Sequence, residues 1–475
     1  MKKYTNTKII ATMGPASTPK EMLTKLFAEG VDVCRLNFSH EQSENHIERY
    51  YYIREVAKSV GRHIGLLLDT KGPEIRTHTF KPDEFGNNKK YTITQGAKVT
   101  IVTNKEIIGD ETTFSVTYEG LYNDVEVGGK ILIDDGYLEL EVLSKDPATK
   151  NIEAVAKNTY TISNRKGVNV PNTVLNMPFI SEKDRGDIII ACKHDFDYIA
   201  ASFTRRAQDV LDIRAILEEQ GKPDIKIIAK IENQEAIDNL DEIIAATDGI
   251  MVARGDLGVE VPAEEVPSLQ KEMVYKCQVM GKIVVVATQM LESMQTNPRP
   301  TRAEVGDVAN AVYEGADSTM LSGESAIGKY PFEAVSYMNR TQNRTELDVD
   351  YEVFAEDAFL YADQNDPSEI IAYSTVRSAL NENVKAIVTV GLKMAKLVSK
   401  YRPRVPIFAL VDTTREATSL AVYFAVNAVV NKDELANELN ELGVTEKDLI
   451  LVVKNNKLKV TSKEKIKYIG GRAQK

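Results

Sequence analysis

The chain has 475 residues, of which 43% are hydrophobic and 27% are charged, a balance that is ordinary for a globular protein with a large core. This length predicts about three domains. The net charge of −11 argues against nucleic acid as a partner, because a phosphate backbone is normally met by an excess of Lys and Arg. It does not exclude small phosphorylated ligands, which need only local positive charge.

The sequence carries no signal for disulfide bonding, export or membrane insertion. Cys34, Cys192 and Cys277 are too few and too far apart for a disulfide framework, and we interpret the first two as buried thiols. No apolar run approaches the ~20 residues that cross a bilayer. The start of the chain leads directly into a strand-like run rather than a signal peptide. We therefore expect a cytoplasmic protein without membrane contact.

Short apolar runs alternate with amphipathic helical patterns eight times along the chain. Such alternation predicts a (β/α)₈ barrel, which typically takes ~250 residues. We assign the barrel to residues 1–72 and 168–340. The predicted strands are Lys8–Met13, Asp32–Phe38, Ile64–Asp69, Tyr198–Ser202, Ile225–Glu232, Gly249–Ala253, Lys282–Thr288 and Ala316–Leu321.

The barrel pattern is interrupted between residues 73 and 167. Apolar and polar residues alternate there, as in Lys98–Val102 and Lys130–Val142, and turns rich in Gly and Asp separate the runs. We predict a small antiparallel β-barrel domain inserted after the third barrel strand. Because loops after barrel strands form the catalytic mouth, this insert is well placed to act as a lid.

A third domain is predicted for residues 341–475. The polar, acidic stretch Thr345–Glu356 is interpreted as a linker, and Pro367–Leu380 as a helix. Lys385–Val390, Pro406–Val411 and Asp448–Val453 have the pattern of parallel strands with helices between them. We therefore expect a separate, doubly wound α/β domain.

Three charged residues follow two neighbouring apolar runs. Lys230 and Glu232 are two apart, so they share one face of the fifth predicted strand, and Asp256 follows a glycine where the sixth should end. Two carboxylates beside a lysine suit a hard divalent cation and an anionic substrate. A buried structural ion pair is the alternative, but three charges at two successive strand ends disfavour it.

Other predicted barrel strands also end in polar side chains. Arg35, Asn37 and Ser39 alternate with apolar residues in the second strand, so they face the mouth together. Their polarity is informative, because helices cover the outside of a barrel and leave few half-exposed strands. The other strand ends contribute Asp69, Thr70, Arg76, Thr288, Ser322 and Glu324.

Ten motifs between about Thr7 and Met338 resemble, in order, those of the pyruvate kinase family. The resemblance implies transfer of the phosphoryl group of phosphoenolpyruvate to ADP, giving pyruvate and ATP in the last step of glycolysis. It also implies a homotetramer. The motifs are Thr7–Ser17, Arg35–His40, Asp69–Thr77, Lys166–Pro171, Ser181–Asp184, Lys230–Asn233, Gly249–Glu260, Ala287–Met294, Pro300–Val312 and Met320–Pro331.

The resemblance implies roles for the charged residues. Phosphoryl transfer depends chiefly on positioning and charge neutralisation, and Arg35, Arg76 and Lys230 would surround the moving group. Lys230 would stabilise its transition state. Glu232 and Asp256 would hold Mg²⁺, or Mn²⁺, against the substrate, while a second ion would arrive on the nucleotide phosphates.

The resemblance also locates the rest of the substrate site. Backbone N–H groups around Gly255 and Asp256 would receive the substrate carboxylate at a helix start. Thr288 would lie near the carbon that gains a proton, with Ser322 and Glu324 in a water relay. Because a threonine hydroxyl is a poor acid, we expect it to relay and position the proton rather than donate it.

Asn37, Ser39, Asp69 and Thr70 match the family's monovalent-cation site. Relatives with Glu at the position of Glu74 resemble K⁺-dependent enzymes, whereas those with Lys there carry a permanent charge. We therefore predict activation by K⁺. The predicted ADP contacts, from the barrel and from the insert, are Asn37, His40, Arg76 and Lys166.

The resemblance weakens in the C-terminal domain. Relatives activated by sugar phosphates carry a phosphate loop rich in Ser, Thr and Gly after the first strand of this domain, whereas Thr389–Ala395 keeps one Thr and one Gly. The tail Tyr468–Ala473 also lacks the family's threonine-rich ending. We expect an enzyme nearly insensitive to fructose 1,6-bisphosphate.

Two other functions fit part of these observations. A barrel lyase or aldolase would use Mg²⁺ with Glu and Asp to stabilise a pyruvate enolate, but it has no phosphoryl group for Arg35, Arg76 and Lys230 to neutralise. A nucleotide- or metabolite-sensing paralogue would have a damaged active site, whereas every key residue is present here. We therefore favour the kinase.

Overall fold

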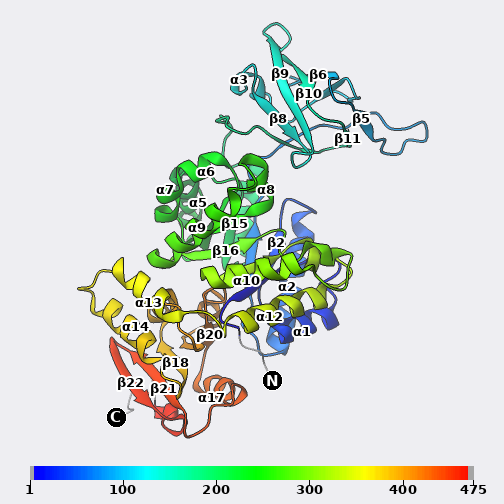
Figure 1. The fold of residues 1–475 in the computed structure, drawn as a ribbon. Helices are drawn as coiled ribbons and strands as arrows, with labels where there is room; N and C mark the ends of the chain where they lie inside the picture. The colour runs from blue at the N-terminus through cyan, green and yellow to red at the C-terminus, as the bar shows by residue number, and fades with distance from the viewer. Residues whose placement is uncertain (1–4, 469–475) are drawn as a thin grey trace.

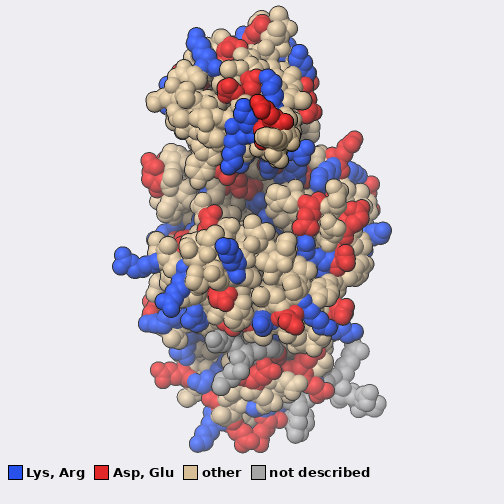
Figure 2. Space-filling model, turned by 90° about the vertical axis from the view of Figure 1, so that its right-hand side faces the viewer, with Lys and Arg blue, Asp and Glu red and all other residues tan. Residues whose placement is uncertain are grey.

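The computed structural model describes residues 5–468 and has three parts in a row (Figure 1). The β-rich insert lies at one end, the barrel in the middle, and the C-terminal α/β part at the other end. Figure 2 shows a constriction between the insert and the barrel, and Lys, Arg, Asp and Glu interspersed over this face. No helix among the described residues is long and apolar enough to cross a membrane.

The central part is a closed barrel of eight parallel strands, as predicted. Each predicted strand overlaps one barrel strand, because continuous apolar runs are buried on both faces, by side chains inside the barrel and by helices outside. The strands, in chain order, are β1 (Lys8–Thr12), β2 (Val31–Asn37), β3 (Gly65–Asp69), β13 (Tyr198–Ala201), β14 (Lys226–Ile231), β15 (Gly249–Ala253), β16 (Ile283–Ala287) and β17 (Ser318–Leu321).

Helices follow these strands and surround the barrel, with α6 and α8 at its end nearest the insert (Figure 1). They are α1 (Lys20–Glu29), α2 (Ser43–Ser59), α4 (Glu182–Lys193), α5 (Ala207–Glu219), α6 (Gln234–Asp238), α7 (Leu240–Ala246), α8 (Arg254–Glu260), α9 (Val266–Met280), α10 (Arg302–Glu314), α11 (Gly323–Ala326) and α12 (Pro331–Thr345), with the short 3₁₀ helix η1 (Glu292–Gln295) before α10.

The insert is a seven-stranded sheet in the order β4-β12-β8-β9-β10-β6-β7, with a separate β11-β5 pair. A bridge between Thr77 and Val116 brings the two edges of the sheet together, so the sheet curls toward closure. The prediction of purely antiparallel pairing was wrong at one place: β6 and β7 are parallel, because residues 103–112 carry the chain back before β7 begins. The elements are β4 (Ile75–Arg76), β5 (Tyr91–Ile93), β6 (Lys98–Val102), β7 (Thr113–Ser115), α3 (Leu121–Asp124), β8 (Lys130–Ile133), β9 (Leu138–Asp146), β10 (Asn151–Ala156), β11 (Tyr160–Ile162) and β12 (Gly167–Asn169).

The C-terminal part is a five-stranded sheet in the order β20-β19-β18-β21-β22. The three predicted strands correspond to β18, β19 and β21. Strand β20 was not predicted, and neither was the antiparallel edge strand β22, whose alternating lysines make it too polar to be recognised. The elements are α13 (Tyr351–Leu360), α14 (Pro367–Ser378), β18 (Val384–Val390), α15 (Leu392–Lys400), β19 (Ile407–Leu410), α16 (Thr414–Thr418), β20 (Val426–Val429), α17 (Lys432–Glu441), β21 (Leu449–Lys454), β22 (Lys457–Thr461) and η2 (Lys463–Tyr468).

The acidic stretch Thr345–Glu356 is not a free linker, so that prediction was wrong. Helix α12 runs to its first residue, and α13 begins inside it at Tyr351, whose side chain is buried. The Glu346 carboxylate accepts hydrogen bonds from the backbone N–H groups of Asn6 and Thr7, at 3.0 and 2.8 Å. Acidic residues that suggested a solvated segment therefore satisfy backbone donors instead.

The predicted effector loop follows β18. Gly391, with φ +91°, forms the turn into α15, and the Thr389 hydroxyl before it is buried. Insensitivity to fructose 1,6-bisphosphate stays a prediction. The part of the tail from Ile469 to Ala473 lies outside the described residues.

Candidate active site

A buried charge cluster lies at the carboxyl ends of β3, β13 and β14. The Lys230 ammonium is 2.9 Å from Glu232 Oε1 and 3.5 Å from Asp69 Oδ1, and it donates a hydrogen bond to Ser202 Oγ at 2.9 Å. The Ser202 hydroxyl in turn donates to Asp69 Oδ1 at 2.9 Å. Ser202 was not singled out from the sequence, although it ends the fourth predicted strand.

Lys230 is held in its charged form. Burial lowers the pKa of the ammonium, but Asp69 and Glu232 outweigh burial, so the net pKa lies above its ordinary value. A lysine held in this way supplies a fixed positive charge in a site that is largely shielded from water.

Arg35 shares Asp69 with Lys230. The guanidinium donates through Nε to Asp69 Oδ2 at 2.6 Å and through Nη1 to Thr12 Oγ1 at 2.9 Å. Burial raises the pKa of Asp69, but Arg35 and Lys230 more than offset it, so the net pKa is lowered. Two cations therefore share one carboxylate at the mouth, where both are placed to meet the negative charge of a phosphoryl group.

The pKa values of Glu232 and Asp256 are shifted upward, in contrast to that of Asp69. Burial raises the pKa of Glu232 to about 7, opposed by Lys230 and reinforced by Asp256. Burial also raises the pKa of Asp256, with Asp135 and Glu74 adding to the rise. Two crowded carboxylates that resist ionisation in this way are stabilised when a cation joins them.

This carboxylate pair fits a divalent cation. Glu232 Oε2 accepts the Phe203 N–H at 2.6 Å, whereas the buried Oε1 lies 2.9 Å from the Lys230 ammonium. No group of three or more His, Cys, Asp or Glu side chains in residues 5–468 is arranged to hold a metal ion. An ion here would therefore take its other ligands from substrate and water, as Mg²⁺ does.

Thr288 lies in a strained turn after β16. Its backbone φ is +65°, in the left-handed region that β-branched residues rarely adopt. Its hydroxyl donates to Ala287 O at 2.6 Å and accepts the Gly255 N–H at 2.8 Å. The Gly255 N–H, predicted to receive the substrate carboxylate, is thus bonded to Thr288.

Glu324 is engaged at both oxygens. Oε1 accepts the Leu291 N–H at 3.1 Å and Oε2 accepts the Ser322 N–H at 2.8 Å, and burial raises the pKa of the carboxyl. These bonds tie the loop after β16 to the end of β17. They suit a positioning role better than the predicted place in a proton relay.

The four predicted monovalent-cation ligands lie at the adjacent ends of β2 and β3. Asn37 and Asp69 are direct partners in the strand register. Asn37 Oδ1 accepts the Ser39 N–H at 3.1 Å, and the buried Thr70 hydroxyl donates to Ala200 O at 3.2 Å. The fold therefore brings the two halves of this predicted site together.

The predicted nucleotide contacts are more dispersed. Arg76 pairs with Glu74 and donates to Arg165 O at 2.8 Å, rather than to the Lys230 cluster. Lys166 pairs with Asp134 of the insert at 2.9 Å. His40 is exposed on the barrel loop after β2.

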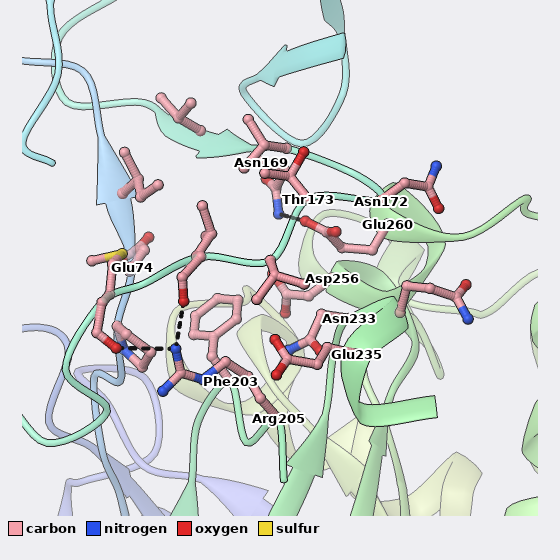
Figure 3. A pocket seen from close by; sticks show the side chains of 18 of the residues that line it. Glu74, Asn169, Asn172, Thr173, Phe203, Arg205, Asn233, Glu235, Asp256 and Glu260 are labelled. Carbon is pink, nitrogen blue, oxygen red and sulfur yellow. Dashed lines mark hydrogen bonds between the residues drawn. The ribbon is translucent and has the colours of Figure 1, made fainter. Parts of the chain in front are cut away.

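A cleft of about 290 Å³ separates the insert from the barrel (Figure 3). Asp256, Glu74 and Asp135 line it, beside Phe203 and Arg205. Arg205 donates to the backbone oxygens of residues 175 and 177, at 3.0 Å each, and so fastens the chain where it returns from the insert. Sequence reasoning missed Phe203 and Arg205, although they directly follow the fourth predicted strand.

The insert also contacts the barrel across this cleft. Asn169 of β12 donates to Glu260 Oε1 of α8 at 2.7 Å (Figure 3). Helix α8 also carries Asp256, so the insert touches the same element that supplies a predicted metal ligand. A lid hydrogen-bonded to the catalytic mouth is suited to shielding a reaction from water.

A (β/α)₈ barrel with an inserted β-domain, two cations on one carboxylate and a carboxylate pair beside them is suited to phosphoryl transfer, so the class indicated is a barrel-type phosphotransferase. The family model "Pyruvate kinase, barrel domain" matches residues 4–335, and "Pyruvate kinase, alpha/beta domain" matches residues 369–470. The chain belongs to the pyruvate kinase family.

Individual relatives agree with the family models. Pyruvate kinase of Bacillus licheniformis is 47% identical over 91% of this chain and 73% of that protein. The enzyme of Geobacillus stearothermophilus is 47% identical over 88% of this chain and 70% of that protein. The crystal structure of a pyruvate kinase from Cryptosporidium parvum is 38% identical, with a TM-score of 0.90 over 96% of each chain. As a member of this family, the chain transfers the phosphoryl group of phosphoenolpyruvate to ADP.

Proposed function

We propose that Lys230 and Arg35 hold the phosphoryl group during this transfer, and that Arg76 joins them from the insert. The observation that carries the proposal is the shared Asp69, which pairs with both cations and so fixes their positions. Fixed cations act most strongly on a transition state when they are buried, since no water must reorganise.

Glu232 and Asp256 would hold Mg²⁺ or Mn²⁺ between the protein and the substrate. When bound, the ion would neutralise the substrate carboxylate and the enolate oxygen that forms as the phosphoryl group leaves. The burial of Glu232 and the raised pKa of both acids, which a bound cation would lower again, support this assignment.

The strand ends of β2 and β3 would hold K⁺ through Asn37, Ser39, Asp69 and Thr70. Glu74 lies nearby in the cleft wall, paired with Arg76. We propose that K⁺ supplies the positive charge that relatives with Lys at this position carry permanently.

Thr288 would position the proton that the enolate gains at carbon, with Ser322 at the adjacent strand end. His40 and Lys166 would contact ADP from the two sides of the cleft. By family resemblance we further propose a homotetramer located in the cytoplasm.

Lys230→Met tests the central assignment, with Lys226→Met as the matched control on the same strand. Lys226 lies at the opposite end of β14, 3.6 Å from Asp248. We expect Lys230→Met to lower kcat by ~10²–10³-fold, as removal of one fixed stabilising group does. Pyruvate binding with Mg²⁺, followed by calorimetry, should persist. Lys226→Met should keep most of the activity.

Turnover of Lys230→Met above one-tenth of the native rate would overturn the assigned role. Assays in buffers free of K⁺ and Na⁺ test the cation site separately, and full activity there would contradict the K⁺ proposal.

A further inference from the structure

Arg254 lies in the motif Gly249–Glu260, but none of the roles assigned above involves its side chain. It stands between the end of β15 and Gly255, and its guanidinium turns toward the loop after β16. Nη2 donates to Thr288 O at 2.7 Å and to Met290 Sδ at 2.9 Å, while Nε donates to Ala287 O at 3.4 Å. One side chain thus satisfies several acceptors of the same turn.

The turn that Arg254 holds is strained at two successive residues. Thr288 has φ +65° and Gln289 has φ +55°, and neither is a glycine. Such backbone conformations persist only where the surroundings fix them, and they concentrate at functional sites. The hydrogen bonds that Arg254 donates to the carbonyl groups of Ala287 and Thr288 help to hold this turn in its strained conformation.

Arg254 is itself anchored. Nη1 lies 2.6 Å from Asp307 Oδ1, on helix α10, and 3.4 Å from Gln270 Oε1 on helix α9. The guanidinium is nearly buried, whereas the Asp307 carboxylate is partly exposed. Two helices outside the barrel therefore set the position of a group that reaches the mouth.

A second contact holds the hydroxyl side of the same turn. The Gly255 N–H, adjacent to Arg254 in the chain, donates to Thr288 Oγ1 at 2.8 Å. The Thr288 carbonyl therefore accepts a hydrogen bond from the Arg254 side chain, and its hydroxyl accepts one from the Gly255 backbone N–H. Asp256 follows directly, so the predicted metal ligand and the Thr288 hydroxyl are set by one short segment.

We propose that Arg254, held by Asp307, is the positioning residue that fixes the Thr288 hydroxyl for protonation of the enolate. This inference rests on the proposed role of Thr288. The guanidinium of Arg254 is engaged with the turn and with α9 and α10, so its loss should affect the proton step rather than substrate binding.

Arg254→Lys is the first test, because lysine keeps the charge next to Asp307 but loses the fork that reaches the turn. We expect kcat to fall ~10-fold with the KM for phosphoenolpyruvate changed less than ~2-fold, as for a displaced catalytic group. Exchange of pyruvate methyl protons into D₂O, measured by NMR with Mg²⁺, K⁺ and ATP, should slow by a similar factor.

Arg214→Lys is the matched control, since Arg214 pairs with Asp248 at 2.9 Å at the other end of the barrel. It should leave kcat and proton exchange unchanged. A higher KM with unchanged kcat in Arg254→Lys would overturn the proposal, because it would indicate ground-state binding. Equal losses in Arg254→Lys and the control would also overturn it, because they would indicate general destabilisation.

A double-mutant cycle with Thr288→Ala tests whether Arg254 affects catalysis through Thr288. If Arg254 acts through Thr288, then Arg254→Lys should change kcat less than ~2-fold once Thr288 is Ala. Additive losses would overturn the inference. If Thr288→Ala itself leaves kcat and proton exchange unchanged, the role proposed for Thr288 fails, a result distinct from additivity.

Discussion

At the scale of single residues, Glu232 and Asp256 would have to be ionised to bind a metal ion, whereas burial favours their protonated forms. Burial raises the pKa of both carboxyls, to about 7 for Glu232. A metal ligand must be ionised, so in the proposed site protons and a divalent cation would compete for the same oxygens. Lys230, whose pKa is raised, stays charged throughout the neutral range and does not take part in this competition.

The Mg²⁺ concentration that gives half-maximal activity should therefore depend on pH. Below the pKa of about 7, protonated Glu232 must lose its proton before the ion binds, so the apparent affinity falls as the pH falls. We expect the half-saturating concentration to rise by up to ~10-fold between pH 8 and pH 6. Steady-state titrations at constant K⁺ and ionic strength measure it. A constant value over this range would contradict the assignment.

At the scale of one element, helix α4 contacts the segments that follow both halves of the predicted cation site. In its first turn, Asp184 Oδ1 accepts the N–H groups of Lys71 and Gly72, at 3.0 and 3.3 Å. These residues directly follow the predicted ligands at the end of β3. Asp187 accepts from the Ser43 hydroxyl at 3.1 Å, beyond the loop that follows β2.

Asp184→Asn should therefore weaken K⁺ activation. The amide keeps an acceptor but loses the charge that strengthens both backbone bonds, at a cost of ~1 kcal/mol, or about 5-fold in the K⁺ concentration for half-maximal activity. The exposed neighbour Glu182→Gln is the control and should match the native enzyme. K⁺ titrations of both variants decide the matter; identical curves would show that α4 does not organise the site.

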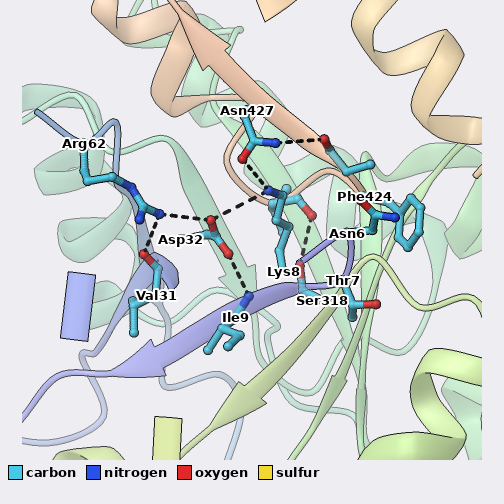
Figure 4. Close-up of polar contacts among 12 residues, drawn as sticks. Asn6, Thr7, Lys8, Ile9, Val31, Asp32, Arg62, Ser318, Phe424 and Asn427 are labelled. Atoms are coloured by element: carbon cyan, nitrogen blue, oxygen red, sulfur yellow. Dashed lines mark hydrogen bonds and ion pairs between the residues drawn. The ribbon is translucent and has the colours of Figure 1, made fainter. Parts of the chain in front are cut away.

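At the scale of the whole molecule, four aspartates make the same kind of hydrogen bond at the amino end of the barrel. Asp32, Asp197, Asp248 and Asp317 lie at the amino ends of alternate barrel strands, and each accepts a backbone N–H from the preceding strand, at 2.8 to 3.0 Å. Figure 4 shows Asp32 with Ile9, Arg62 and Lys8. Their guanidinium partners are Arg62, Arg54, Arg214 and Arg402.

The fourth of these arginines comes from the C-terminal part rather than from the barrel. Arg402 is almost fully buried, and its guanidinium donates to Asp317 Oδ2 at 2.8 Å, Gly315 O at 3.0 Å and Ser399 O at 3.0 Å. Asp317 also accepts the Phe424 N–H at 3.0 Å. The pair therefore joins the base of the barrel to the domain beneath it.

Arg402→Met should destabilise the protein by ~3–5 kcal/mol, because removing one partner leaves Asp317 buried and unpaired. Arg344→Met, which breaks an exposed pair with Asp348, should cost less than ~1 kcal/mol. Denaturant unfolding followed by circular dichroism compares the two. Equal stability of the variants would show that this buried pair does not hold the domains together.

The barrel was predictable because its signal is local and repeated. Eight apolar runs, each followed by a helical pattern, leave one compact arrangement, and polar residues at their ends must then gather at one rim. The polar strand β22 and the parallel pairing of β6 with β7 were not predictable, since edge strands and connections depend on distant partners.

By itself, the sequence determined the barrel, the family and the reaction, because Lys230, Glu232 and Asp256 sit in motifs whose spacing places them at strand ends. Only the tertiary structure decided which groups these residues meet. Ser202 between Lys230 and Asp69, Arg254 on the Thr288 turn, and Arg402 on Asp317 each join segments far apart in the chain. Such contacts depend on the packing of helices and loops around the strands, which periodicity along the chain does not encode.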